Sequence, residues 1–374
     1  MTQQLSATLT PLDVALGGLL DRARAIAPIE VSLAEAVGCV AAEMPRLAAP
    51  LPPFAVAMVD GWAMRSHDLA GASAYAPAPL PAHPIWVEAG EKLPDGCDCV
   101  IDESSVERSG PLFQVVAEAI PGEGVRRAGA DFAAGASTLA GGRRVAAADL
   151  IAARAVGRDT LNVRRPHVRM VTVPARDGHD HTAEFIEAMA REAGARATLT
   201  VAVARDVTSI ATAIGNDACD LLLLVGGSGI GHSDAAVDAL ARRGTVAAHG
   251  IALHPGRTAA VGHVGAAPAV VIPGAPASAL VVWFALARPL LDRLALRAPR
   301  QAVVRPLARK IASAIGFAEL VLLRSIDGQW MPLAAGDLPL GQIAAADAWL
   351  IVPGASEGYA EGAPVGAFLL RDGA

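Results

Sequence analysis

The stretch LLLLVGGSGIGHSDAAVDALARRG, residues 221–244, decides the fold. Its first five residues form an unbroken apolar run, which is typical of a strand buried on both faces. Four glycines follow within the six residues 226–231, and residues 234–243 have a helical pattern. A glycine-rich bend between a buried strand and a helix raises the question of which ligand, if any, it holds.

The surrounding sequence repeats this alternation and predicts a parallel sheet with helices on both faces. The predicted strands are residues 168–173, 199–203, 221–225 and 269–272. The predicted helices are residues 182–193, 207–214, 234–243 and 276–296, the last with a kink at Pro289.

The flanking regions have a different texture. Residues 10–26, 32–36 and 146–155 are predicted helices, the first with Thr10 as a cap before Pro11. Residues 46–145 are rich in proline and glycine with short apolar runs such as 115–120, which predicts an inserted β-rich module. Short runs at residues 320–323, 348–352 and 364–370 predict a small C-terminal β-barrel or sandwich.

Composition narrows the class of protein. The 374 residues are 53% hydrophobic and carry a formal net charge of −6, which argues against a nucleic-acid-binding surface. The longest apolar run, residues 279–287, is too short to span a bilayer, and the first residues do not resemble a signal peptide. Four cysteines in so long a chain do not indicate a disulfide framework. We therefore expect a cytoplasmic protein.

The glycine-rich bend is expected at the carboxyl end of its strand, where open parallel sheets bind ligands. It contains no Gly-Lys-Ser/Thr, so it is not a usual triphosphate loop, and its spacing departs from the dinucleotide fingerprint. Two readings remain: a tight turn without ligand, or backbone amides that bind an anion or a cofactor phosphate.

Two further loops are expected at the same sheet edge. The turn at Pro273 and Gly274 follows a strand and precedes a helix, in which Ser278 could either bind an anion or cap the helix. His254 and Arg257 lie on a loop between the two glycine-bearing segments. Together the three loops predict a phosphate or pterin pocket.

These motifs, in this order, resemble those of the MoeA family of molybdopterin molybdotransferases, whose relatives include the gephyrin E domain. The resemblance extends over nearly the whole chain. It rests on LPPFAVAMVDGWA (residues 51–63), AGEKLPDGCD (89–98), RRAGAD (126–131), GGSGIGHSD (226–234), IPGAPASA (272–279) and VPGASEGY (352–359).

The resemblance implies four domains. They are a helical linker domain (residues 1–45 and 146–164), the inserted β-rich domain (46–145), a MogA-like α/β molybdopterin-binding domain (165–298) and a C-terminal β-barrel domain (299–374). It also implies that the protein inserts molybdate into adenylylated molybdopterin and releases AMP, with Mg²⁺, at a site between the inserted module of one subunit and the sheet domain of its partner in a homodimer. A MogA-like protein or a client molybdoenzyme is a further implied partner.

The same resemblance assigns site residues. Asp60 and Asp131 fall on the family's catalytic acids, and with Asp234 they would bind the metal. The residues expected to bind molybdopterin are Gly226, Gly227, Ser228, Gly229, Gly231, Asp234, His254, Arg257, Pro273, Gly274 and Ser278.

This sequence departs from the family at polar positions. Its VPARD (residues 173–177) stands where the family has TGDEL, so that the family's aspartate and glutamate are Ala175 and Arg176. Further replacements are Ala89, Ala130, Gly229, Ala275, His254 and Arg257. Two hypotheses follow: a working molybdotransferase with an altered site, or a weakened molybdopterin-binding carrier that serves one molybdoenzyme.

Two other clusters have competing interpretations. His179 and His181, which alternate with acids, fit either a metal site or a solvated loop. Cys97 and Cys99 fit a metal site, but their position in an apolar run favours a buried strand.

Overall fold

The structure is a computed structural model that describes residues 3–5, 8–80, 83–110, 112–175, 178 and 180–370. The chain divides into two compact units. The sheet unit comprises Met1–Glu43, Gly141–Ala147 and Asp159–Ala374, and the inserted unit comprises Met44–Ala140 and Ala148–Arg158. The division into four domains with the boundaries expected from the sequence stays a prediction.

A six-stranded sheet forms the centre of the sheet unit, with strand order β13-β12-β14-β18-β17-β15. The first four strands run parallel, as the sequence predicts: β12 (His167–Thr172), β13 (Arg196–Val201), β14 (Leu221–Val225) and β18 (Ala267–Ile272). The last two were not predicted, and each pairs antiparallel with its neighbour: β17 (Ala260–Val264) with β18, and β15 (Thr245–His249) with β17. The α/β fold class is confirmed.

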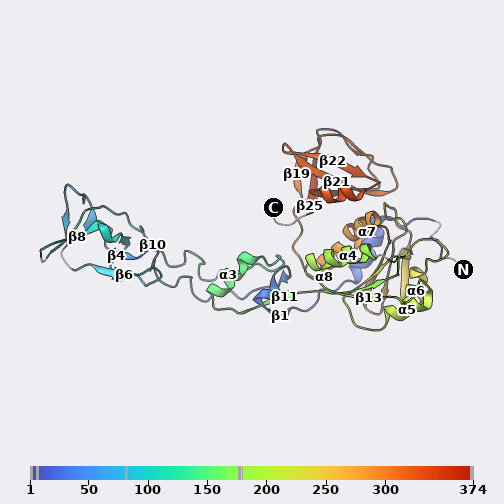
Figure 1. The fold of residues 1–374 in the computed structure, drawn as a ribbon, viewed down its shortest axis with the longest axis horizontal. Coiled ribbons are helices and arrows are strands. Elements are labelled where there is room, and N and C mark those ends of the chain that lie inside the picture. Colours follow the sequence, from blue (N-terminus) through green and yellow to red (C-terminus); the bar gives the residue numbers. More distant parts are fainter. Residues whose placement is uncertain are drawn as a thin grey trace. The chain divides into compact units, whose positions relative to one another are not determined.

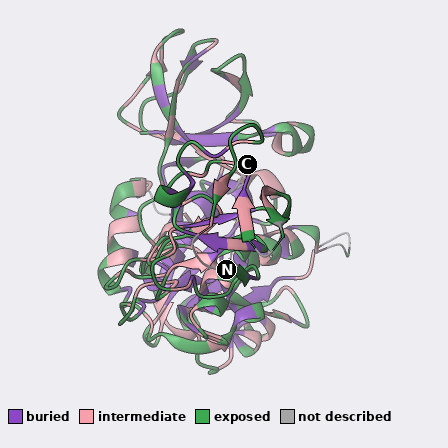
Figure 2. Ribbon diagram, turned by 90° about the vertical axis from the view of Figure 1, so that its left-hand side faces the viewer, coloured by how far each residue is buried: buried purple, intermediate pink, exposed green. Residues whose placement is uncertain are grey.

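Helices cover both faces of this sheet because β14 is apolar at every position. Leu221 and Leu223 belong to a core that includes α4 (His181–Glu192), whereas Leu222 and Leu224 face α5 (Val207–Ile214) and α6 (Ala236–Arg243). Figure 2 shows the resulting concentration of buried residues in the strands.

The long helix predicted over residues 276–296 is a continuous run of three parts. They are α7 (Pro276–Val282), a π-helical turn (Trp283–Ala287, η3) and α8 (Arg288–Leu294). Pro289 has no N–H to donate to the carbonyl of Ala285, and the widened turn lies directly before it. The predicted irregularity is therefore present one turn before the proline.

The N-terminal segment contains strands as well as the predicted helices. Helices α1 (Leu12–Arg22) and α2 (Leu33–Ala36) are accompanied by the three-stranded sheet of β1 (Ile29–Ser32), β11 (Thr160–Arg164) and β2 (Val40–Ala41), whereas α3 (Ala147–Ala155) belongs almost wholly to the inserted unit. Thr10 does not cap α1, and this prediction was wrong. Its backbone instead pairs with the segment at Ile251, so the helix begins at Leu12 with Pro11 as the residue before it.

The inserted unit is β-rich, and its strands form three small sheets, β10-β3, β6-β4-β7 and β5-β9-β8. The predicted run at residues 115–120 is a strand only at Val115, because the polar groups that follow bind loops: Glu118 accepts a hydrogen bond from the Gly71 N–H, and Glu123 accepts one from Ile120. The elements are β3 (Val56–Ala57), β4 (Gly61–Met64), η1 (Ser66–Leu69), β5 (Ala78–Pro79), β6 (Ile85–Val87), β7 (Cys99–Ile101), η2 (Glu103–Ser105), β8 (Val106–Ser109), β9 (Leu112–Val115) and β10 (Val125–Arg126).

The C-terminal region is a second sheet of order β16-β21-β23-β25-β19, with β22 paired to β21. Figure 1 labels its strands β19, β21, β22 and β25. Trp330 links β22 to the end strand β19, since its indole N–H donates to the Val303 carbonyl of β19 at 3.1 Å. The elements are β16 (Leu253–His254), β19 (Val303–Pro306), β20 (Ile311–Ala312), β21 (Ala318–Ile326), β22 (Gln329–Ala335), α9 (Leu340–Ala345), β23 (Ala348–Val352), β24 (Gly358–Tyr359) and β25 (Pro364–Leu369). Within the described ranges, no helix has the length and apolarity that crossing a bilayer requires.

Candidate functional site

A pocket of about 280 Å³ lies beyond the carboxyl ends of β12, β14 and β18, where parallel sheets bind ligands. We call it the sheet-edge pocket. It contains seven of the predicted site residues, which supports the expectation that these loops share one edge. Its lining is Thr172, Val173, Ala175, Asp180, Thr182, Ala183, Arg205, Val225, Gly226, Gly227, Ser228, Gly229, Asp234, Thr258, Pro273 and Gly274.

The glycine loop needs glycine at its first position for two reasons. Gly226 has φ +91°, where L residues are strained, and a Cβ there would lie 3.3 Å from the Val173 carbonyl oxygen. Its N–H donates to the Ile272 carbonyl at 2.9 Å, which ties the start of the loop to the end of the neighbouring strand β18. The sequence therefore turns sharply as it leaves β14.

The carbonyl groups of this loop are bound from one side by two buried side chains. The amide NH₂ of Gln3 donates to the carbonyls of Gly227 (2.8 Å) and Gly229, and its oxygen accepts from Val237 N–H of α6 at 3.1 Å. One ring nitrogen of His249 lies 2.9 Å from the Ser228 carbonyl and the other 2.9 Å from that of Gln4. Gln3 is 4% exposed and His249 6%.

Three amide groups of the same loop have no protein partner among the described residues. Across the part of the chain that the structure describes, the N–H groups of Gly227, Ser228 and Gly229 meet no acceptor. In a trans peptide the N–H points opposite to the preceding carbonyl. Because the carbonyls of Gly227 and Ser228 face Gln3 and His249, the N–H groups of Ser228 and Gly229 face away from them. Successive free amides of this kind form an anion-binding nest.

Two neighbouring loops complete the uncharged wall. The Thr182 hydroxyl, at the start of α4, donates to the Gly274 carbonyl at 2.7 Å and so ties the second glycine turn to α4. The Ser228 hydroxyl lies 3.1 Å from that of Thr258. Pro273 and Ser228 are buried. These contacts therefore hold the pocket wall in place.

Two charged side chains that line the pocket, Arg205 and Asp234, bind each other. The guanidinium of Arg205 donates to the Pro174 carbonyl at 2.5 Å and to the Asp234 carboxylate at 3.1 Å. The second oxygen of Asp234 accepts from the Gly231 N–H at 3.0 Å. A third charged group, Asp180, accepts from the Ala175 N–H at 3.1 Å. Both acids are therefore already engaged by donors of the protein.

The other predicted loop lines a separate cavity of about 610 Å³ that includes His254, Arg257 and Ser278. It shares Thr258 with the sheet-edge pocket, so the two cavities adjoin. His254 pairs with Glu319 of β21, the imidazole nitrogen and carboxylate oxygen lying 3.5 Å apart. Within the described ranges Ser278 makes no capping hydrogen bond to α7, which excludes the capping interpretation.

The predicted catalytic acids belong to the inserted unit. Asp60 lies in the turn before β4 and accepts from the Ala89 N–H at 2.7 Å. Asp131 is paired with Arg126 through a contact of 2.5 Å. Both side chains are on the surface of their unit. Their catalytic role stays a prediction.

The remaining cysteine and histidine clusters show no metal chemistry in the described residues. Cys99 is buried in β7, donates to the Met64 carbonyl, and burial raises the pKa of its thiol to about 12. His181 lies on α4 and pairs with Glu184, while His179 is outside the described residues. No group of three or more His, Cys, Asp or Glu side chains in the described part of the chain could hold a metal ion.

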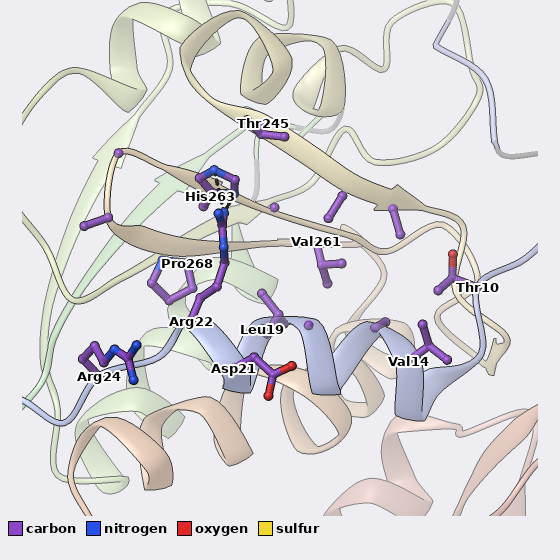
Figure 3. A pocket seen from close by; sticks show the side chains of 17 residues that line it. Thr10, Val14, Leu19, Asp21, Arg22, Arg24, Thr245, Val261, His263 and Pro268 are labelled. Carbon is purple, nitrogen blue, oxygen red and sulfur yellow. Dashed lines mark hydrogen bonds between the residues drawn. The ribbon is translucent and has the colours of Figure 1, made fainter.

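A larger cavity, about 770 Å³, lies between α1 and the strands β15 and β17 (Figure 3). Its walls are largely apolar, with Arg22 close to His263, and it contains none of the predicted site residues. It borders the antiparallel strands at the side of the sheet. This cavity is therefore distinct from the site formed by the predicted loops.

Sequence reasoning missed three residues of the site, Gln3, Arg205 and His249. Arg205 had a detectable signal, because it follows a strand and directly precedes Asp206, whose carboxylate caps α5. The N–H of Ser209 on that carboxylate lowers the pKa of Asp206. Gln3 and His249 had none, since their partners are distant in sequence.

Comparison with known proteins identifies the family. Residues 10–157 match the MoeA N-terminal region (domain I and II), and residues 155–293 match a probable molybdopterin binding domain. The chain belongs to the MoeA family. This confirms the resemblance carried by the six motifs and places the chain in molybdenum cofactor biosynthesis.

Individual relatives agree with the assignment to the MoeA family. The chain is 28% identical to molybdopterin molybdenumtransferase 1 of Mycobacterium tuberculosis, over 92% of this chain and 96% of the relative. It is 29% identical to molybdopterin molybdenumtransferase 2 of that organism, over 74% and 77%. The molybdopterin biosynthesis MoeA protein of Pyrococcus horikoshii shares the fold, with TM-score 0.74, 24% identity, and 97% and 100% of the two chains covered.

Proposed function

We propose that this MoeA-family chain is a molybdopterin molybdotransferase, which binds adenylylated molybdopterin, inserts molybdate at the dithiolene and releases AMP. The observation that carries the proposal is the glycine loop. Its carbonyls are bound by Gln3 and His249, while three of its amides have no acceptor among the described residues. An anionic ligand in the sheet-edge pocket supplies the acceptor that those amides lack.

The two adjoining cavities suit a substrate with anionic groups at both ends. The free amides and Arg205 offer hydrogen-bond donors in the first, and Arg257 and His254 offer basic side chains in the second. Arginine binds oxyanions through a planar fork of donors, which orients the anion as well as neutralising it. The residues thus position the substrate. Asp60 and Asp131 are proposed as the catalytic acids contributed by the inserted unit.

The Mg²⁺ implied by the resemblance does not fit Asp234 or Asp131, two of the three carboxylates assigned to it. Both oxygens of Asp234 are engaged, one by the Arg205 guanidinium and one by the Gly231 N–H. Asp131 is likewise paired with an arginine, Arg126. Hard cations need carboxylate oxygens that are free to coordinate. No step of the proposed reaction is therefore assigned to a metal.

A second function is favoured by the same engaged acids. A chain in which Asp131 and Asp234 are neutralised by its own arginines could bind molybdopterin and deliver it to one molybdoenzyme without turnover. The substitutions Ala175 and Ala89 point in the same direction, since each removes a polar group expected at the site. Assembly as a homodimer, a MogA-like partner and a cytoplasmic location stay predictions under either function.

The test is AMP release. Purified protein is mixed with adenylylated molybdopterin, molybdate is added, and AMP is measured by chromatography, with Mg²⁺ and in EDTA. A molybdotransferase should release AMP within minutes. Binding of the substrate without AMP release would support the carrier. Replacing Asp131 by Asn should lower the rate about tenfold or more if this acid is catalytic. The matched control is Asp95→Asn, which removes a fully exposed acid of the same unit.

A further inference from the structure

We propose that Arg205 binds the phosphate of the ligand in the sheet-edge pocket by exchanging Asp234 for it, so that binding there needs no divalent cation. The inference rests on the proposed function, because it concerns the anionic ligand of that same pocket. It assigns to one side chain of this chain the positive charge that the family resemblance assigns to Mg²⁺.

Arg205 has donors to offer. Two of its terminal N–H groups bind the Pro174 carbonyl and Asp234, whereas its Nε is buried and out of a ligand's reach, so the terminal N–H groups are the donors available to a ligand. A guanidinium carries five N–H donors, of which only these two contacts are used. An oxyanion that replaces Asp234 could accept, in the plane of the guanidinium, from the terminal nitrogen that now binds Asp234 and leave the Pro174 contact intact.

The backbone holds this arginine at the correct edge of the sheet. Arg205 follows β13, which runs parallel to β12, so it emerges where the loops of the pocket emerge. The next residue, Asp206, caps α5 by accepting from the Thr208 and Ser209 N–H groups at 2.9 Å. The side chain is 24% exposed. A partly buried charge of this kind is screened by salt less than a surface charge.

The carboxylates around it are held by donors of the protein, and one of them is paired with the arginine itself. Asp234 gives one oxygen to Arg205 and the other to Gly231 N–H, and Asp180 binds the Ala175 N–H. Ala175 itself stands where the resemblance expects an aspartate. The pocket has therefore lost a carboxylate at one position and contains an arginine that neutralises the acid at another.

This arrangement makes Asp234 a competitor for the ligand. While Asp234 is bound to Arg205, a phosphate must displace it before it can use the same N–H group. Replacing Asp234 by Asn preserves an oxygen for the Gly231 N–H and removes the competing charge. The anion should then bind more tightly. A metal ligand would behave in the opposite way, because its loss weakens the cation and the anion together.

The experiment is titration calorimetry with AMP as the probe, on the full chain, in EDTA and again with Mg²⁺. The wild type should bind equally in both buffers. Arg205→Met should weaken binding about tenfold or more, as expected for loss of a charged hydrogen bond, and Asp234→Asn should tighten it several-fold. Arg191→Met is the matched control, since it removes an exposed arginine paired with Glu187 on α4, and it should bind as the wild type does.

Three outcomes would overturn the proposal: binding that requires Mg²⁺, weaker binding by Asp234→Asn, or no binding of AMP by the wild type. Far-ultraviolet circular dichroism of each variant verifies that it is folded. The result is separable from the proposed function. AMP release by a protein whose binding of AMP requires Mg²⁺ would sustain the molybdotransferase and reject this inference, whereas Arg205-dependent binding without AMP release would do the reverse.

Discussion

Two loops meet at the sheet-edge pocket, and they are fixed in different ways. The loop after β14 is set by its backbone: Gly226 has a positive φ, and Gln3 and His249 bind its carbonyls. In the loop after β12, two side chains bind the main chain, Arg205 at Pro174 and Asp180 at Ala175.

The difference explains where this chain keeps its family's pattern and where it departs from it. A loop defined by backbone geometry tolerates few residue types, and Gly226, Gly227 and Gly231 keep the glycines of the family's motif, although Gly229 replaces its serine. A loop held by side chains can exchange one set of charges for another without a change of fold. Variants that disturb the backbone geometry should therefore destabilise the protein more than variants that change a charged side chain.

The largest effect is expected from Gly226→Ala. The new Cβ requires a strained φ and lies 3.3 Å from the Val173 carbonyl, so we expect unfolding to become easier by about 3 kcal/mol. Chemical denaturation measures it. The control is Gly265→Ala, at φ +58° with open space around the Cβ, which should cost about 1 kcal/mol. Equal costs would contradict a loop defined by close packing.

Removing the support behind the same loop should have the next largest effect. Gln3→Ala leaves the Gly229 carbonyl and the Val237 N–H without their partner, at a cost of about 2 kcal/mol. Affinity for AMP should fall as the loop loses its fixed carbonyls. Gln4→Ala is the control, because Gln4 takes part through its backbone oxygen alone. If Gln3→Ala bound AMP as tightly as this control, the N-terminal contact would not position the loop.

Restoring the family's serine in the glycine loop should have a smaller effect. In Gly229→Ser the new Cβ would lie 2.6 Å from a carboxylate oxygen of Asp234, so that side chain must rotate away. We expect a loss of about 1 kcal/mol, the scale of one hydrogen bond. In a double-mutant cycle with Asp234→Ala the penalty should disappear. An additive cycle would show that the two positions do not interact.

Much of this comparison could be read from the sequence, and the reasons for the rest are physical. Strand 221–225 was predicted to the residue because its apolar run and glycines are local signals. Strands β15 and β17 were missed because Gly262 resembles a loop residue, although a Cβ there would meet the Thr245 carbonyl. Gln3 lies 224 residues from Gly227, and no local pattern records that contact.

The smallest effect concerns acid. The N–H of Ser209 lowers the pKa of Asp206, so the folded state is stabilised above the ordinary aspartate value of about 3.9, and this stabilisation is lost as the pH falls through the lowered pKa. Hydrogen exchange at the start of α5 should therefore quicken below about pH 4 relative to α6. Asp206→Asn should remove this pH dependence. If Asp206→Asn showed the same pH dependence of hydrogen exchange as the wild type, the Asp206 cap would not be what stabilises the start of α5.

One measurement tests the central claim most directly: a crystal structure of the full chain with AMP bound. The account predicts phosphate density within hydrogen-bonding distance of the Ser228 and Gly229 amides and of the Arg205 guanidinium, with the Asp234 carboxylate turned away. Phosphate bound elsewhere, such as in the cavity between α1 and β17, with Asp234 still paired to Arg205, would contradict it.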